Sequence, residues 1–174
     1  MKVTNKLAAM GLGSSLVLAG GLIAPWEGLS LVAYKDIVGV WTQCYGNTYG
    51  VDKHNPKTDA QCTSELAEEV KKHNEIMLKP VKVPLTIYQE AAFTSLVYNI
   101  GGPAWNKSTA LVLLNQGKYT EACYQLLRWN KAGGKVVKGL TNRRQSELEV
   151  CLGNNQQAVL EAERVVKLYK EGKL

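Results

Sequence analysis

The stretch that decides the fold is residues 27–42, which read EGLSLVAYKDIVGVWT. It combines aromatic and β-branched residues with glycines, and Gly46 and Gly50 follow it. Runs of this composition, bounded by glycine, predict short strands joined by tight turns. We therefore expect residues 27–50 to form a small β-hairpin or three-stranded sheet, with turns near Asp36 and Gly46.

After a polar loop at residues 52–59, apolar residues recur at the spacing of a helix. Thr63 predicts the start of a helix that ends before Pro80, and Thr86 predicts the cap of a second helix. The second helix is apolar enough to be buried at the centre of a domain, and it should stop at Gly101. Further segments are a flexible, glycine-containing connector at 131–139 and helices at about 108–116, 119–130, 141–152 and 156–171. The chain is therefore predicted to be α+β, with a small N-terminal β lobe, a larger helical lobe and a cleft between them.

The bulk composition excludes several classes of protein. A length of 174 residues favours one domain, and 45% hydrophobic with 21% charged residues exclude a disordered chain. The formal net charge of +6 suits an anionic partner, such as nucleic acid, an acidic membrane surface or a bacterial cell wall. The basic residues are scattered rather than clustered, so we expect no nucleic-acid partner. We also expect a monomer that needs no cofactor.

The cysteines and histidines argue against a metal site. Four cysteines occur without a Cys-x-x-Cys pair, and the only two histidines are far apart in the sequence. Zinc needs clustered ligands, so neither a structural zinc nor a zinc amidase is predicted. An even number of cysteines fits disulfides formed in an oxidising compartment, although four cysteines allow three connectivities. Because each pair would bridge neighbouring elements, we expect Cys44–Cys62 and Cys123–Cys151, with unpaired buried cysteines as the alternative.

The N-terminal segment has the pattern of a membrane anchor. No charged residue occurs from Leu7 to Trp26, while Lys2 and Lys6 precede this stretch and Glu27 follows it. Twenty helical residues span about 30 Å, the thickness of a bilayer core, and the flanking lysines predict an N-terminus that stays in the cytoplasm. A cleaved signal peptide, a permanent transmembrane anchor and a weakly held anchor all fit this pattern.

The composition of the segment favours the weakly held anchor. Half of residues 7–26 are glycine, alanine or serine, which contribute little to insertion into lipid. A signal peptidase could recognise residues 19–21, but cleavage there would leave few residues ahead of Glu27. We therefore expect the segment to be retained.

Two carboxyl groups in residues 27–42 are candidates for cleaving a glycosidic bond, which needs one protonated acid and one ionised group. Glu27 has apolar neighbours in the sequence, which favour the protonated form of a carboxyl group. Asp36 lies in a polar turn beside Lys35, which favours the ionised form, and the hydroxyl of Thr42 could hold a water. A glutamate and an aspartate at this spacing are nevertheless common, and two solvated surface carboxylates are the alternative.

The order of glutamate, eight residues, aspartate, five residues and threonine resembles the catalytic signature of phage-type lysozymes, glycoside hydrolase family 24. Further family elements are matched in order by residues 98–101 (YNIG), 128–129 (RW) and 143–144 (RR), so the likeness covers roughly residues 22–152. Asn47 departs from the pattern, because some relatives have a histidine there that braces the β lobe, and this puts the brace in doubt. The N-terminal segment is similar to that of the signal-anchor-release endolysins of lambdoid phages.

The resemblance implies a lysozyme-like fold and an endolysin that hydrolyses the β-1,4 bond between N-acetylmuramic acid and N-acetylglucosamine in bacterial peptidoglycan. Glu27 would be the general acid, Asp36 would position or activate the attacking water, and Thr42 would lie on the face of that water. The family inverts at the anomeric carbon, which requires carboxyl groups roughly 6.5–9.5 Å apart. Asn99 would line the cleft. Arg143 would pair with the catalytic glutamate, with a solvent-facing charge at a helix start as the alternative.

The resemblance also implies a conflict within the N-terminal segment. In the family, the helix that ends at the catalytic glutamate belongs to the enzyme body, and here that helix, at about residues 19–27, overlaps the anchor. We therefore expect residues 1–26 to be a signal-anchor-release segment and 27–174 to be the catalytic domain, with the helix shared. The enzyme would be inactive in the host inner membrane and active in the periplasm after release. No cysteine lies in residues 1–26, so refolding must do the switching.

Rival functions remain open at this point. A lytic transglycosylase also uses one glutamate but forms a 1,6-anhydro sugar, and Asp36 and Thr42 would then be idle. A membrane-tethered wall-binding protein without catalysis is a rival of another class. A chitinase-like enzyme is a weaker third.

Overall fold

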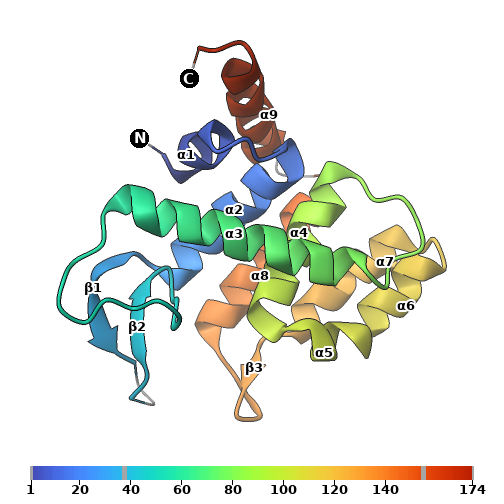
Figure 1. Cartoon of the computed structure of the whole chain (residues 1–174). Coiled ribbons are helices and arrows are strands. Elements are labelled where there is room, and N and C mark those ends of the chain that lie inside the picture. The colour runs from blue at the N-terminus through green and yellow to red at the C-terminus, as the bar shows by residue number, and fades with distance from the viewer. Residues whose placement is uncertain (1, 37–38, 154–155, 174) are drawn as a thin grey trace.

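The computed structural model describes residues 2–36, 39–153 and 156–173, in which a small β lobe lies beside a larger helical lobe (Figure 1). The β lobe is the antiparallel hairpin of β1 (Ser30–Lys35) and β2 (Trp41–Cys44), so the predicted hairpin is confirmed. An isolated bridge between Gln43 and Asn47 follows it. The other elements are α1 (Val3–Ala9), α2 (Ser14–Glu27), α3 (Asp59–Leu78), α4 (Ile87–Ile100), α5 (Gly102–Asn106), α6 (Thr109–Asn115), α7 (Tyr119–Tyr124), the 3-10 helix η1 (Gln125–Arg128), β3 (Lys131–Ala132), β4 (Lys135–Val136), α8 (Lys138–Cys151) and α9 (Gln156–Lys170).

Helix α4 is the central helix of the fold. Thr86 forms a capping box with Gln89 at its start, and residues 91–97 are all buried. The helix packs against α2, α3 and α8 (Figure 1). It ends at Gly101, whose φ of 76° lies in the left-handed region that glycine adopts without strain. The prediction of a buried central helix between Thr86 and Gly101 is confirmed.

The predicted start of the preceding helix is wrong. Helix α3 begins at Asp59 rather than Thr63, because Thr58 and Gln61 form a capping box one turn earlier. The hydroxyl of Thr63 instead donates to the carbonyl oxygen of Asp59 inside the helix, at 2.8 Å. Because threonine suits both roles, the residue three positions after each candidate decides which one caps the helix.

The predicted flexible connector at residues 131–139 is also wrong. Strands β3 and β4 pair across a tight turn at Gly133 and Gly134, both of which have positive φ, and α8 begins directly afterwards at Lys138. Adjacent glycines serve equally well in a hairpin turn and in a flexible linker. Composition alone therefore does not separate the two.

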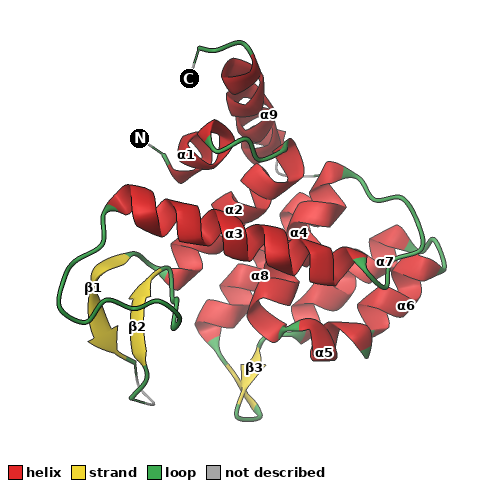
Figure 2. Ribbon diagram, viewed as in Figure 1, coloured by secondary structure: helices red, strands yellow, loops and turns green. Residues whose placement is uncertain are grey.

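The N-terminal segment is folded into the helical lobe as two helices. A turn in which Gly11 has a φ of 79° separates α1 from α2, and Leu7, Val17 and Ile23 are completely buried. The two helices pack against each other and against α9 (Figure 2). No helix in the described part of the chain combines the length and the apolar character needed to cross a membrane.

The contact between α1 and α2 depends on Gly20. A Cβ atom at this position would lie 2.2 Å from Cδ1 of Leu7, far inside van der Waals contact, so a larger side chain would displace the buried Leu7 side chain from its place on α2. A Cβ atom at Gly13 would meet nothing within 4 Å. The glycines of the segment therefore make very different demands on the folded protein.

Two disulfides join neighbouring elements, and they are the pairs expected from the sequence. Cys44–Cys62 connects β2 to α3, and Cys123–Cys151 connects α7 to α8. The sequence separations are 18 and 28 residues. Closing loops of this length restricts the unfolded chain and stabilises the folded one by about 3 kcal/mol each.

Replacing both Cys123 and Cys151 by serine should lower the free energy of unfolding by about 3 kcal/mol, because the unfolded chain regains the freedom of the closed loop. Urea denaturation followed by circular dichroism measures the loss. An unchanged unfolding midpoint would contradict the contribution assigned to this disulfide.

Candidate active site

Glu27 lies where the two lobes meet. It is the last residue of α2, which begins at Ser14 rather than near residue 19, and Gly28 with a φ of 68° turns the chain into β1. The Glu27 side chain is 23% exposed. A Cβ atom on Gly46 would lie 3.5 Å from its Oε2, so the turn after β2 approaches the carboxyl group closely. Glu27 is therefore flanked by both lobes and still open to water.

The apolar surroundings expected for Glu27 are only partly present. Ile23 is buried, but Trp26 and Leu29 are 37% and 45% exposed. The nearest partner is charged, since Nη1 of Arg143 donates to Oε1 of Glu27 at 2.8 Å. Arg143 is only 3% exposed, so the alternative that it faces solvent is wrong. Partial shielding from water strengthens this charge-assisted hydrogen bond.

Arg143 is itself held by a buried carboxylate that the sequence analysis missed. Oε1 of Glu147 accepts hydrogen bonds from Nε of Arg143 at 3.3 Å, Nη2 of Arg144 at 2.8 Å and Oγ of Ser95 at 2.7 Å. Both arginines precede Glu147 by three or four residues on α8, and this spacing places side chains on one helix face. That spacing was the available signal in the sequence.

The network reaches the end of α4 through Arg144. Its Nη1 donates to Oδ1 of Asn99 at 3.1 Å, while Asn99 itself remains exposed. Burial lowers the pKa of Arg144, and the Glu147 carboxylate opposes this shift. Asn99 and Glu27 thus lie at the two ends of one chain of ionic hydrogen bonds that runs through Arg144, Glu147 and Arg143.

Tyr98 adds a neutral contact between the lobes. Its hydroxyl donates to the carbonyl oxygen of Tyr45 at 3.4 Å, and its ring lies 4.8 Å from the ring of His73. Burial raises the pKa of Tyr98 well above its ordinary value, and the negative charge of Glu27 raises it further. Tyr98 therefore stays protonated throughout the physiological pH range.

Asp36 and Thr42 lie on the hairpin that follows Glu27. Asp36 directly follows the last residue of β1, and its Oδ1 accepts a hydrogen bond from the backbone N–H of Val40 at 2.8 Å across the turn. Thr42 lies opposite Tyr34 in the sheet and is 4% exposed, and its hydroxyl donates to the carbonyl oxygen of Val40 at 3.2 Å. Residues 37–38 of the signature stretch lie outside the described residues. The catalytic roles of Asp36 and Thr42 stay predictions.

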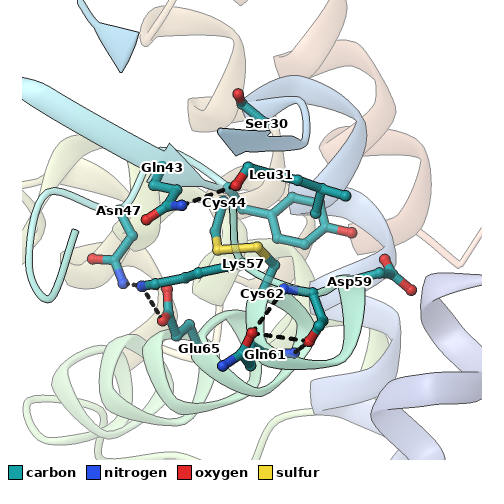
Figure 3. Close-up of a disulfide and its surroundings, with 12 residues drawn as sticks. Ser30, Leu31, Gln43, Cys44, Asn47, Lys57, Asp59, Gln61, Cys62 and Glu65 are labelled. Carbon is teal, nitrogen blue, oxygen red and sulfur yellow. Dashed lines mark hydrogen bonds and ion pairs between the residues drawn. A yellow bond between two sulfur atoms is a disulfide. The ribbon is translucent and has the colours of Figure 1, made fainter. Parts of the chain in front are cut away.

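The β lobe is braced against α3 at several points around the Cys44–Cys62 disulfide (Figure 3). Nδ2 of Asn47 donates to Oε2 of Glu65 at 3.0 Å, and Lys57 forms an ion pair with the same glutamate. Asn47 therefore braces the β lobe through its amide, although some relatives have a histidine at this position. These contacts fix the position of the hairpin that carries Asp36 and Thr42.

Gln43 organises the interior of the β lobe and was also missed. It is completely buried, and its Nε2 donates to the carbonyl oxygens of Leu31 at 2.9 Å and Asn55 at 3.3 Å. Its Oε1 accepts from the backbone N–H of Asp52 at 3.0 Å. One amide side chain thus forms hydrogen bonds with backbone groups from both the strand and the loop. Among the described residues, no group of three or more histidine, cysteine, aspartate or glutamate side chains could hold a metal ion.

Replacing Gln43 by alanine should lower the free energy of unfolding by about 3 kcal/mol, because it opens a cavity and leaves backbone groups without partners. Thermal and urea unfolding of the purified protein measure the loss. Gln61→Ala is a matched control at an exposed position on α3, and it should lose about 1 kcal/mol with its half of the capping box. Equal losses in the two variants would contradict the role assigned to Gln43.

Comparison with known proteins gives a consistent result. The family model described as phage lysozyme matches residues 24–147. The SAR-endolysin of Pseudomonas phage phiKMV is 41% identical over 150 residues, covering 83% of this chain and 92% of that protein. The SAR-endolysin of Enterobacteria phage P21 is 40% identical over 157 residues, covering 86% of this chain and 94% of that protein. The solved endolysin from Escherichia coli O157:H7 phage FAHEc1 superimposes with a TM-score of 0.70 at 30% identity, covering 81% of this chain and 92% of that one.

Proposed function

This chain belongs to the phage lysozyme family, and we propose that Glu27 is the general acid of its active site. The chain is a muramidase-type endolysin, a glycoside hydrolase whose substrate is bacterial peptidoglycan. The observation that carries the assignment of Glu27 is its buried partner, Arg143, which orients a partly exposed carboxyl group where the lobes meet. The bond cleaved is the β-1,4 linkage between N-acetylmuramic acid and N-acetylglucosamine, and its cleavage causes lysis of the host cell.

The proposed reaction uses two carboxyl groups on opposite sides of the sugar. Glu27 donates its proton to the glycosidic oxygen as the bond from that oxygen to the anomeric carbon breaks. Asp36 accepts a proton from a water whose oxygen attacks the anomeric carbon from the other face, and Thr42 holds that water through its hydroxyl. The product has inverted configuration, as expected when a water fits between the two carboxyl groups. Asn99 lines the cleft that binds the substrate, and Arg143 orients Glu27.

We further propose that residues 1–26 anchor the protein in the host inner membrane, with a cytoplasmic N-terminus, before release into the periplasm. The relatives carry the name SAR-endolysin, and residues 7–26 have no charge. In the folded protein the same residues form α1 and α2, and α2 delivers Glu27 to Arg143. A segment embedded in lipid cannot also occupy these positions, so the anchored protein has no complete active site.

The small residues of the segment serve both of its states. Glycine, alanine and serine make insertion only weakly favourable, and Gly20 allows Leu7 of α1 to pack on α2. A firmly held anchor with larger side chains would therefore fail twice, once by resisting release and once by blocking the fold.

Changing Glu27 to Gln should lower kcat by roughly three orders of magnitude, because the amide cannot donate the proton. Asp36→Asn should lower kcat by roughly two orders, and Thr42→Ala by less. Glu68→Gln, at an exposed position on α3, is the control and should keep full activity. Turbidity loss of purified cell wall gives the rates, and mass spectrometry of the released muropeptides should find reducing ends. Anhydro ends, or a Glu27→Gln protein that still lyses cells, would contradict the proposal.

Two variants, in each of which leucine replaces a different glycine of the segment, test the membrane proposal. Gly13→Leu and Gly20→Leu each favour insertion by about 0.5 kcal/mol, so both should keep the protein longer in the membrane fraction and delay lysis. Only Gly20→Leu should also lose wall-degrading activity after extraction with detergent and refolding, because only there does the side chain collide with Leu7.

Prompt lysis by the Gly13→Leu protein would argue against the anchor. Wild-type activity of refolded Gly20→Leu protein would argue against the requirement for α1 and α2 in the enzyme body. The two variants thus separate membrane retention from folding.

A further inference from the structure

Glu147 takes no part in the reaction proposed above. Its buried carboxylate nevertheless binds Arg143, which in turn binds Glu27. We propose that Glu147 is a positioning residue that limits how strongly Arg143 binds Glu27, and thereby sets the pH range in which Glu27 keeps its catalytic proton. The proposal rests on the assignment of Glu27 as the acid.

The guanidinium of Arg143 bridges the two carboxyl groups. Nη1 contacts Glu27 at 2.8 Å, Nε contacts Glu147 at 3.3 Å, and Nη2 donates to the carbonyl oxygen of Ser95 at 3.4 Å. All three guanidinium nitrogens are used, and Glu147 itself is completely buried. The contact with Glu147 therefore helps to fix the direction in which the Arg143 side chain points toward Glu27.

The charges of the cluster explain why such a partner is needed. A guanidinium beside a carboxyl group favours its ionised form, whereas a general acid must begin the reaction protonated. Glu147 shares its negative charge between Arg143 and Arg144, so Glu27 faces a partly compensated cation instead of two uncompensated ones. Tyr98 of α4, which stays neutral, and Glu69 of α3 are further titratable groups in this surrounding.

The cluster carries features that stability alone does not explain. Within the described part of the chain, Oε2 of Glu147 and Nε of Arg144 are buried without a hydrogen-bond partner. Burial raises the pKa of Glu147, and the two arginines oppose that shift. A buried ion cluster with unsatisfied atoms is a poor substitute for apolar packing. The position of this cluster behind Glu27 is consistent with a role in controlling the charge beside the Glu27 carboxyl group.

Two substitutions test the proposal because they change the charge beside Arg143 in opposite directions. Glu147→Gln keeps the shape and removes the compensating charge, so the alkaline limb of the kcat profile should move to lower pH by roughly one unit, with roughly ten-fold lower kcat at neutral pH. Arg144→Gln leaves Glu147 entirely to Arg143, so the limb should move to higher pH. Glu149→Gln, at an exposed position on the same helix, is the matched control and should leave the limb unchanged.

A merely structural role would lower activity or stability in both variants without shifts of opposite sign. Circular dichroism establishes that each variant folds, and if Glu147→Gln protein does not fold, the shift in Arg144→Gln protein decides. Unchanged limbs, or shifts in the same direction, would overturn the role of Glu147. If the Glu27→Gln protein remains active, the assignment of Glu27 as the acid fails as well. If the Glu27→Gln protein is inactive but the alkaline limb of the Glu147→Gln protein is unshifted, only the role of Glu147 is refuted.

Discussion

The rest of the site depends on one ion pair, between Glu27 at the end of α2 and Arg143 within α8. Arg143 is buried, and a buried guanidinium is costly without carboxylate partners. One of its partners, Glu147, is always present on the same helix. The other arrives only when the N-terminal segment folds as α2. The contact between Glu27 and Arg143 therefore depends on the folding of residues 14–27 as α2.

Helix α9 extends this coupling beyond the region matched by the family. The match ends at residue 147, whereas α9 spans Gln156–Lys170 and packs on both α1 and α2. Ala162, Val165 and Val166 are its buried residues on this side. Helices α1 and α2 thus lie between α9 and the rest of the helical lobe.

The sequence predicted well what depends on local pattern or on residues close in the chain. The hairpin of residues 30–44 follows from β-branched residues between glycines, and α4 follows from a cap and an apolar run. Prediction from the sequence failed where one local pattern fits two structures. Thr63 could cap a helix or lie inside one, and residues 131–139 could form a flexible linker or a hairpin. Gln43 and Glu147 were missed for another reason. Their importance comes from backbone groups and charges that only tertiary packing brings to them, and a buried polar residue looks like a surface one until its partners are known.

In the proposed membrane-bound state, charge also contributes to the balance between anchor and enzyme body. Many apolar residues of the segment, such as Leu7, Val17 and Ile23, are shielded from water in the folded core as they would be in lipid, so for them the hydrophobic effect hardly separates the two states. The membrane potential acts on Lys2 and Lys6 by about 2.3 kcal/mol per charge per 100 mV. After release these lysines pair with Glu161 and Asp59, but such partly exposed ion pairs contribute about 1 kcal/mol at most. In that proposed state, the ion pairs would be too weak by themselves to draw the segment out against a potential of this size.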